Sequence, residues 1–121
     1  MKLEEATILA LQGKLNESKD TRLTVYEIVN KVLINLEHND LVADYKVNEL
    51  DSYEENKISF NIVIILGEAQ GLSATYLAKD LQKELEEKLT DVNSISVSGE
   101  RYTHYRTHDR RINLLIDIVM K

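Results

Sequence analysis

One stretch decides the fold: residues 58–66 read ISFNIVIIL. Apolar side chains occupy every second position from Ile58 to Leu66, which is the two-residue period of a β-strand with one buried face. The other face begins polar, at Ser59 and Asn61, and becomes apolar toward the end of the stretch. The pattern therefore predicts a central strand whose inner face is wholly apolar.

Three more stretches alternate in the same way. The strongest is residues 111–120, RINLLIDIVM, and weaker alternation covers Leu41–Leu50 and Ser94–Tyr102. Short polar segments at 51–57 and 103–109 separate the strands of each pair. Because short connections favour antiparallel hairpins, we predict one four-stranded, largely antiparallel sheet.

The remaining apolar segments have helical spacing. We predict helices over Leu3–Leu15, Thr24–His38 and Ala74–Leu89, with a polar break at Asn16–Arg22 between the first two. Thr24 and Glu27 have the spacing of a capping box at the start of the second helix. Ser73 is the expected N-cap of the third.

The predicted fold class is therefore α+β, with element order α-α-β-β-α-β-β and helices packed on the sheet. With 121 residues the chain fits a single domain, in which residues 1–20 form an N-terminal helical extension that can act as an interface element. The apolar side chains of that extension cover more than one face of a helix, which is typical of a helix that is buried on several sides or docks against a partner.

Composition excludes several classes of protein. The chain has no Cys, so it has no disulfide framework, thiolate metal site or cysteine nucleophile. Its 15 Lys and Arg against 21 Asp and Glu give a net charge of -6, which argues against general coating of nucleic acid or anionic membrane. No apolar run approaches the roughly 20 residues of a membrane span. We expect a cytoplasmic protein, or a virion component, without a membrane segment.

Four apolar residues fall on the outer face of the predicted sheet, between Ser, Asn and Asp. We expect them to form an apolar spot covered either by the first helix or by another subunit. They are Val63, Ile65, Leu115 and Val119.

Residues 100–111, which we call the Arg/Tyr hairpin, are the main anomaly of composition. They hold four of the five arginines, two of the three histidines and two of the six tyrosines. Arginine provides planar, forked donors for carboxylates and phosphates, and Tyr and Arg are enriched at the centres of interfaces. The alternative is a solvated hairpin whose arginines pair with neighbouring acids. The candidate binding residues are Arg101, Tyr102, His104, Tyr105, Arg106, His108, Arg110 and Arg111.

An opposite charge lies earlier in the chain. The segment from Glu37 to Glu55, which we call the acidic segment, has seven acids against the single Lys46. If it lies at the opposite edge of the sheet from the Arg/Tyr hairpin, the two can drive head-to-tail assembly, which closes into a ring when the rotation permits. If they lie side by side, they neutralise each other within one molecule.

Other roles for the Arg/Tyr hairpin have less support. An anionic ligand, such as a nucleotide or RNA, can be held by its arginines with bases stacked on Tyr102 and Tyr105, although the net charge opposes this. A metal site at His104, His108 and Asp109 is disfavoured by the neighbouring arginines. No nucleophile is paired with a base in a recognisable motif, so we expect no enzyme and no cofactor.

From Thr24 onward, the order of helix, hairpin, helix and hairpin, which ends in the strong strand Arg111–Met120, resembles the layout of small tail-terminator and tail-completion proteins of bacterial viruses. Proteins of that kind are similar in length and assemble into rings at the end of the tail tube. The resemblance implies a structural component that works as a ring. Together these observations predict a non-catalytic assembly module, most simply a homo-oligomer or a partner of another protein.

Overall fold

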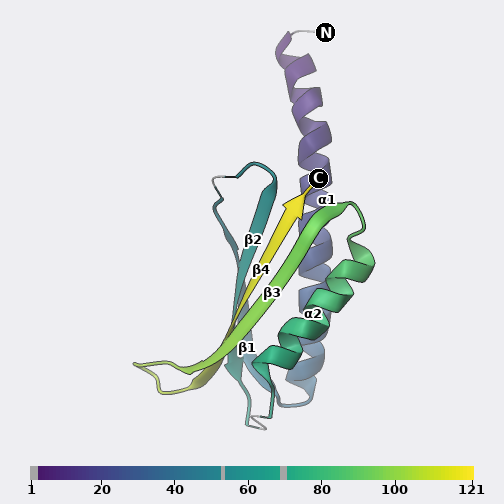
Figure 1. Ribbon diagram of the computed structural model, residues 1–121. Helices are drawn as coiled ribbons and strands as arrows, with labels where there is room; N and C mark the ends of the chain where they lie inside the picture. The colour runs from purple at the N-terminus through teal and green to yellow at the C-terminus, as the bar shows by residue number, and fades with distance from the viewer. Residues whose placement is uncertain (1–2, 53, 69–70) are drawn as a thin grey trace.

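A computed structural model describes residues 3–52, 54–68 and 71–121, with side chains from Asp20 onward within those ranges. The helices and strands follow the chain in the order α-β-β-α-β-β (Figure 1). They are α1 (Leu3–His38), β1 (Val42–Leu50), β2 (Lys57–Leu66), α2 (Ala74–Lys88), β3 (Val92–Thr103) and β4 (Arg110–Met120).

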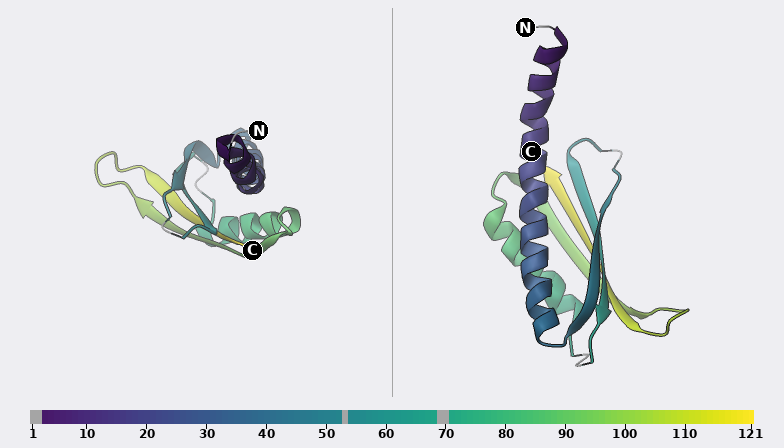
Figure 2. Two further views of the ribbon diagram at one scale, coloured as in Figure 1. Left: turned by 90° about the horizontal axis from the view of Figure 1, so that it is seen from above. Right: turned by 180° about the vertical axis from the view of Figure 1, so that it is seen from behind.

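The sheet has the strand order β1-β2-β4-β3, and each neighbouring pair is antiparallel. Both helices lie on the same face of it, which we call the inner face; the other is the outer face (Figure 2). The predicted α+β class and four-stranded antiparallel sheet are therefore confirmed. Since β2 and β4 are central, the two most apolar stretches of the sequence occupy the most buried positions.

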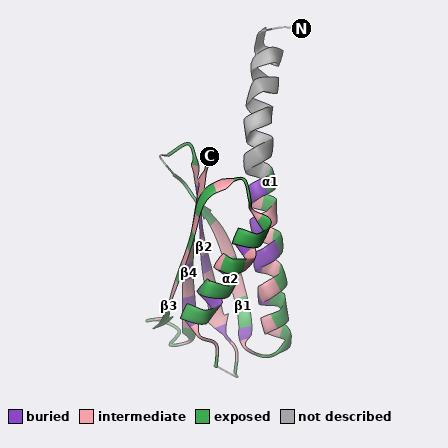
Figure 3. Cartoon of the chain, turned by 45° about the vertical axis from the view of Figure 1, so that its right-hand side comes forward, coloured by how far each residue is buried: buried purple, intermediate pink, exposed green. Residues whose placement is uncertain are grey.

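The core lies between the inner face and the two helices (Figure 3). Phe60 is fully buried at its centre, and the Tyr26 ring of α1 meets it edge-on with ring centroids 5.4 Å apart. The predicted helix Ala74–Leu89 is α2, and the leucines that give it helical spacing are buried at Leu77, Leu81 and Leu85. Ser73 caps α2 by accepting a hydrogen bond from the Tyr76 N–H, as predicted.

The predicted break between two N-terminal helices is wrong. Residues 3–38 form the single helix α1, so the structure has two helices in these ranges and not three. Thr24 does not begin a helix; its hydroxyl donates to the Asp20 carbonyl 2.9 Å away, one turn earlier in the same helix. The segment Asn16–Arg22 contains neither Gly nor Pro. Polar residues of moderate propensity lower helix stability without ending the helix.

α1 is longer than the sheet beside it. Its 36 residues correspond to about 54 Å of helix, whereas the nine residues of β1 span about 30 Å. Arg22 Nε lies 2.6 Å from Glu49 Oε1, near the end of β1, and Tyr45 donates to Asn30 Oδ1 3.0 Å away. The C-terminal half of α1 therefore lies alongside the whole length of β1.

The start of β1 departs from simple alternation. Alternation over Leu41–Leu50 predicts Ala43 on the same inner face as Tyr45 and Val47, but a β-bulge between Val42 and Asp44 exposes Ala43 and buries Val42 instead. Nearby, Gly67 packs so closely on the Asp40 carbonyl that a Cβ atom would overlap it. One extra residue in a strand reverses the faces of those before it, which a period of two does not anticipate.

Candidate interaction surface

The Arg/Tyr hairpin joins β3 to β4 and projects from the sheet (Figures 1 and 2). Its loop is closed by hydrogen bonds from the His104 N–H to the Asp109 carbonyl, 2.9 Å, and from the His108 N–H to the His104 carbonyl, 2.8 Å. His108 has φ 60°, in the left-handed region that His tolerates better than most residues. The loop is therefore an ordered turn.

His104 organises this turn from within. Its Nδ1 accepts the backbone N–H groups of Arg106 and Thr107, each 3.3 Å away, and lies 3.1 Å from the Thr107 hydroxyl. Because Nδ1 accepts, the ring hydrogen of the neutral side chain is on Nε2. His104, predicted to be a binding residue, is thus half-buried and engaged in shaping the loop.

Arg111 is also engaged within the hairpin. It holds Asp109 with two bonds, Nε to Oδ1 at 2.6 Å and Nη2 to Oδ2 at 3.3 Å. This hydrogen-bonded guanidinium lowers the pKa of the Asp109 carboxyl, and the same bond raises the pKa of Arg111. The geometry of Arg111 is therefore that of the alternative interpretation, an arginine paired with a neighbouring acid.

The remaining hairpin side chains face solvent. Tyr105 is 75% exposed and stacks on His104, with ring centroids 5.3 Å apart. The Arg106 guanidinium carbon lies over the Tyr105 ring, 5.4 Å from its centroid. Arg106 and Arg110 have no ion-pair partner among the described residues. A shallow depression is lined by Arg110 together with Arg101, Tyr102 and Thr103. His108 is exposed, and no three His, Asp or Glu side chains gather as metal ligands in the described ranges.

The four predicted outer-face residues are all half-buried and do not form one continuous spot. Val63 and Ile65 are neighbours along β2, whereas Leu115 of β4 pairs with Asn61 and is separated from Val63 by the Asn61–Asn113 hydrogen bond. Val119 is separated from them by Asp117, which accepts the Ser59 hydroxyl at 2.5 Å. The described part of α1 packs on the inner face through Val25, Val29 and Leu33, so it does not cover these residues.

A polar row divides the apolar outer-face residues. Asn61 donates to Asn113 Oδ1 at 2.5 Å and to the Leu114 carbonyl at 3.2 Å, across the β2–β4 pair. With the Ser59–Asp117 bond, this makes the middle of the outer face a hydrogen-bonded ladder between the central strands. Sequence patterning treated these residues only as the polar half of an alternation, because their pairing depends on strand register.

The acidic segment and the Arg/Tyr hairpin lie at opposite edges of the sheet, since β1 and β3 are its two edge strands. The turns are also at opposite ends: β1 and β2 meet beyond the Leu50–Ser59 pair, whereas β3 and β4 meet beyond the Thr103–Arg110 pair. Glu49 is engaged by Arg22 of α1. Mutual neutralisation of the two hairpin turns within one molecule is therefore not the arrangement found.

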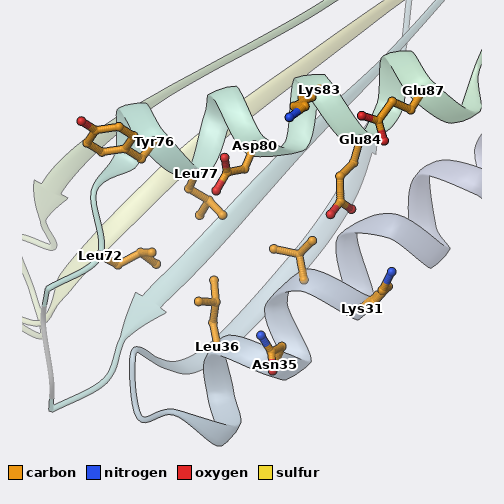
Figure 4. Close-up of a pocket in the computed structure, with 11 residues that line it drawn as sticks. Lys31, Asn35, Leu36, Leu72, Tyr76, Leu77, Asp80, Lys83, Glu84 and Glu87 are labelled. Carbon is orange, nitrogen blue, oxygen red and sulfur yellow. The ribbon is translucent and has the colours of Figure 1, made fainter.

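A groove between α1 and α2 was missed at the sequence level (Figure 4). It encloses about 640 Å³ and has Val32, Leu36, Leu72 and Leu77 along its floor. Its rims carry charges of both signs, and Tyr76 at one end is 71% exposed. The one sequence feature that could have indicated this groove is Tyr76, an aromatic residue on the otherwise polar face of the predicted helix Ala74–Leu89.

Comparison with known proteins gives no match: no protein-family model and no curated protein aligns with this chain. Within the described residues, neither helix has an apolar stretch long enough to cross a bilayer.

Proposed function

We propose that this protein is a non-catalytic assembly module that forms a symmetric homo-oligomer through contacts between oppositely charged edges of neighbouring copies. One observation carries the proposal: the Arg/Tyr hairpin and the acidic segment lie at opposite edges of one sheet, and the β1–β2 turn of the acidic segment is at the opposite end of the sheet from the β3–β4 turn. Surfaces that are complementary but separated on one molecule meet only between molecules. This is the arrangement of a head-to-tail interface.

The exposed part of the hairpin supports this role. Arg106, Arg110 and Tyr105 are residue types enriched at the centres of interfaces, and all three are exposed. An ordered turn, held by His104 and Arg111, presents them with little conformational entropy left to lose on binding. Rigid presentation of aromatic and guanidinium groups favours recognition of a protein surface.

Light scattering after gel filtration, at low and at high salt, tests the proposal. We expect a discrete oligomer at low salt that loosens at high salt, because exposed charges are screened. Replacing Arg106 and Arg110 together by Ala should weaken it, whereas Lys79→Ala with Lys83→Ala, which removes the same charge from exposed α2 positions, should not. A monomer at both salt concentrations would overturn the proposal.

We further propose that the oligomer serves as a structural or adaptor component of a virus or mobile element, in the virion or the cytoplasm. The support is the resemblance of the chain from Thr24 onward to tail-terminator proteins, whose helix-hairpin-helix-hairpin order is also the order here. Electron microscopy of the purified oligomer tests this extension. Closed rings of uniform size are expected, and open filaments or irregular particles would contradict it.

A second candidate function is binding of an anionic ligand, such as a nucleotide or RNA. The observation that favours it is the depression at Arg101, Tyr102, Thr103 and Arg110, where two arginines and an aromatic ring surround one hollow. A thermal-shift screen against nucleotides and short RNAs tests it. A stabilisation lost in Arg110→Ala is expected, and no shift with any compound would exclude this function for that panel.

A further inference from the structure

The acids of the acidic segment fall into groups with different surroundings. One group precedes or begins β1, at the end of the sheet where the Arg/Tyr hairpin emerges: Glu37, Asp40 and Asp44. Glu49 is already paired with Arg22 of α1. The last group lies beyond the end of β1, in the turn that joins it to β2: Asp51, Glu54 and Glu55. We call residues 51, 52 and 54–56 the acidic turn.

The carboxylates of the acidic turn are exposed, and none of them has an ion-pair partner among the described residues. The cation that follows the turn, Lys57 at the start of β2, has its Nζ atom 3.9 Å from Asp117 Oδ1 of β4. The acidic turn therefore presents its negative charges uncompensated, at the opposite end of the sheet from the Arg/Tyr hairpin.

Hydrogen bonds order the acidic turn. The Ser52 hydroxyl accepts the Glu54 N–H at 3.2 Å, and the Glu54 carbonyl accepts the Lys57 N–H, also at 3.2 Å. The Asn56 carbonyl accepts the Met120 N–H at 2.6 Å, which ties the turn to the end of β4. Because the Arg/Tyr hairpin is also ordered, the two turns lose little conformational entropy when they meet.

An exposed apolar residue adjoins the acidic turn. Leu50, the last residue of β1, is 40% exposed. The Arg/Tyr hairpin has a matching composition, since the exposed Tyr105 ring lies under the Arg106 guanidinium and Arg110 is exposed nearby in the sequence. An apolar residue beside carboxylates and an aromatic ring beside guanidinium groups are complementary in both polarity and charge.

The two surfaces are too far apart to meet within one molecule. The row of paired residues that contains Arg111 lies next to the Arg/Tyr hairpin, and the row that contains Lys57 and Val119 lies next to the acidic turn. From residue 111 to residue 119 of β4 is eight residues, or about 26 Å at about 3.3 Å per residue. The hairpin extends beyond the first row and the acidic turn beyond the second, so the real separation is larger.

We propose that the acidic turn receives the Arg/Tyr hairpin of a second copy. The two exposed guanidinium groups of that hairpin lie against Glu54 and Glu55. Its Tyr105 ring lies against Leu50. This proposal rests on the assembly function above and names the surface on each copy that makes the contact.

The direction of the hairpin agrees with a closed assembly. The Arg/Tyr hairpin bends away from the strands as it leaves the sheet (Figures 1 and 2). A neighbour held at its tip is therefore rotated relative to the first copy, and rotation between copies is what allows a head-to-tail interface to close into a ring. Since both helices lie on the inner face, the acidic turn is open to a narrow hairpin from the outer side.

Two variants with opposite defects test the contact. Arg106→Ala with Arg110→Ala leaves the acidic turn intact, whereas Glu54→Gln with Glu55→Gln leaves the hairpin intact. Each variant alone should raise the dissociation constant of the oligomer about tenfold or more, because every interface then lacks one side. Mixed in equal amounts, at a concentration at which neither associates alone, they should form heterodimers and nothing larger. Only one intact hairpin and one intact turn are available to each pair, and analytical ultracentrifugation measures the result.

The matched control is Glu86→Gln with Glu87→Gln, which removes the same two charges from exposed positions of α2. It should assemble as wild type does. If Glu54→Gln with Glu55→Gln also assembles as wild type, or if the mixture gives no heterodimer, the proposed contact is wrong. A wild-type oligomer at low salt then leaves the assembly function standing, whereas a wild-type monomer at both salt concentrations removes both.

Charge reversal gives an independent readout. Arg106→Glu with Arg110→Glu, or Glu54→Arg with Glu55→Arg, places like charges across the contact and should abolish assembly at low salt. All four changes in one chain restore opposite charges on the two surfaces and should restore the oligomer. A fourfold variant that unfolds in urea as wild type does but stays monomeric would contradict the proposed pairing.

The apolar part of the contact is tested at Leu50. Leu50→Ala should raise the dissociation constant about three- to tenfold at low and at high salt, because salt does not screen an apolar contact. Leu23→Ala removes the same side chain from a 50% exposed position of α1 and should leave the dissociation constant unchanged. Equal effects of the two changes would remove Leu50 from the proposed contact.

Discussion

The inner and outer faces of the sheet are made by the same strands and are held together differently. On the inner face of β2 and β4, Phe60, Ile62, Ile64 and their neighbours are fully buried under the helices. On the outer face, apolar side chains are half-buried and interleaved with the hydrogen-bonded pairs Ser59–Asp117 and Asn61–Asn113. The inner face specifies the fold, and the outer face and its edges remain available for contacts between molecules.

The largest expected effect is on the inner face. Phe60→Ala removes a fully buried ring and its contact with Tyr26, and should lower the free energy of unfolding by about 3–5 kcal/mol. Urea denaturation measures it. Tyr76→Ala, at a 71% exposed position, is the control and should change stability by less than about 0.5 kcal/mol. If Phe60→Ala lowers the free energy of unfolding by less than about 1 kcal/mol, the inner face is not the main source of stability.

Adjacent residues of β3 allow the same comparison on a smaller scale. A Cβ at Gly99 would lie 2.5 Å from Leu114 Cδ2 and 3.1 Å from the Ala74 carbonyl oxygen at the start of α2. Gly99→Ala should therefore cost about 1–3 kcal/mol through overpacking, measured by thermal or urea unfolding. Ser98→Ala, exposed on the outer face, should be nearly neutral. Equal effects at the two positions would mean that α2 can shift to admit the methyl group.

The alternation of apolar residues was enough to predict the sheet, its inner face and the stripe of α2, because these patterns are local and each has a single period. The alternation gave a wrong prediction at two places, where a local feature of the backbone does not follow the pattern of apolar and polar residues. The β-bulge at Ala43 exchanged the faces at the start of β1, and the polar run at Asn16–Arg22 did not interrupt α1. Neither is encoded by a residue with a strong backbone preference, such as Pro.

The candidate surface was predictable only as a composition. Clustering of Arg and Tyr identified residues 100–111. Which of these residues hold the turn, and which are exposed, depends on contacts in the folded turn. His104 and Arg111 hold the turn, whereas Arg106 and Arg110 face solvent. The hydrogen bond from the Val97 N–H to Gln82 Oε1 joins residues that are 15 apart in the sequence and that meet because α2 packs beside β3. No local sequence pattern predicts this bond.

The outer face should show a smaller, pairwise effect. Asp117→Ala leaves the Ser59 hydroxyl, in a residue only 6% exposed, without its 2.5 Å acceptor, and should cost about 1–2 kcal/mol in urea unfolding. Adding Ser59→Ala should recover part of that loss, because no unpaired hydroxyl then remains. If the double variant is as unstable as the sum of both single changes, the ladder does not act as a pair.

The smallest expected effect concerns the Arg/Tyr hairpin, which lies beyond both faces and whose Asp109–Arg111 ion pair should contribute to stability through charge. The Arg111 guanidinium lowers the pKa of Asp109 below that of the unfolded chain. A depressed carboxyl pKa contributes stability that is present above the unfolded value of about 3.9 and is lost as the pH falls through the native pKa. Wild type should therefore exceed Asp109→Asn in urea midpoint at pH 7, and the gap should close progressively in acid. Arg111→Gln removes the cation that pairs with Asp109. In that background, Asp109→Asn should no longer change the urea midpoint in a pH-dependent way. If the gap persists at the acid limit, Asp109 stabilises the turn through its shape, as His104 does, and the hairpin resembles the packed inner face more than an exposed edge.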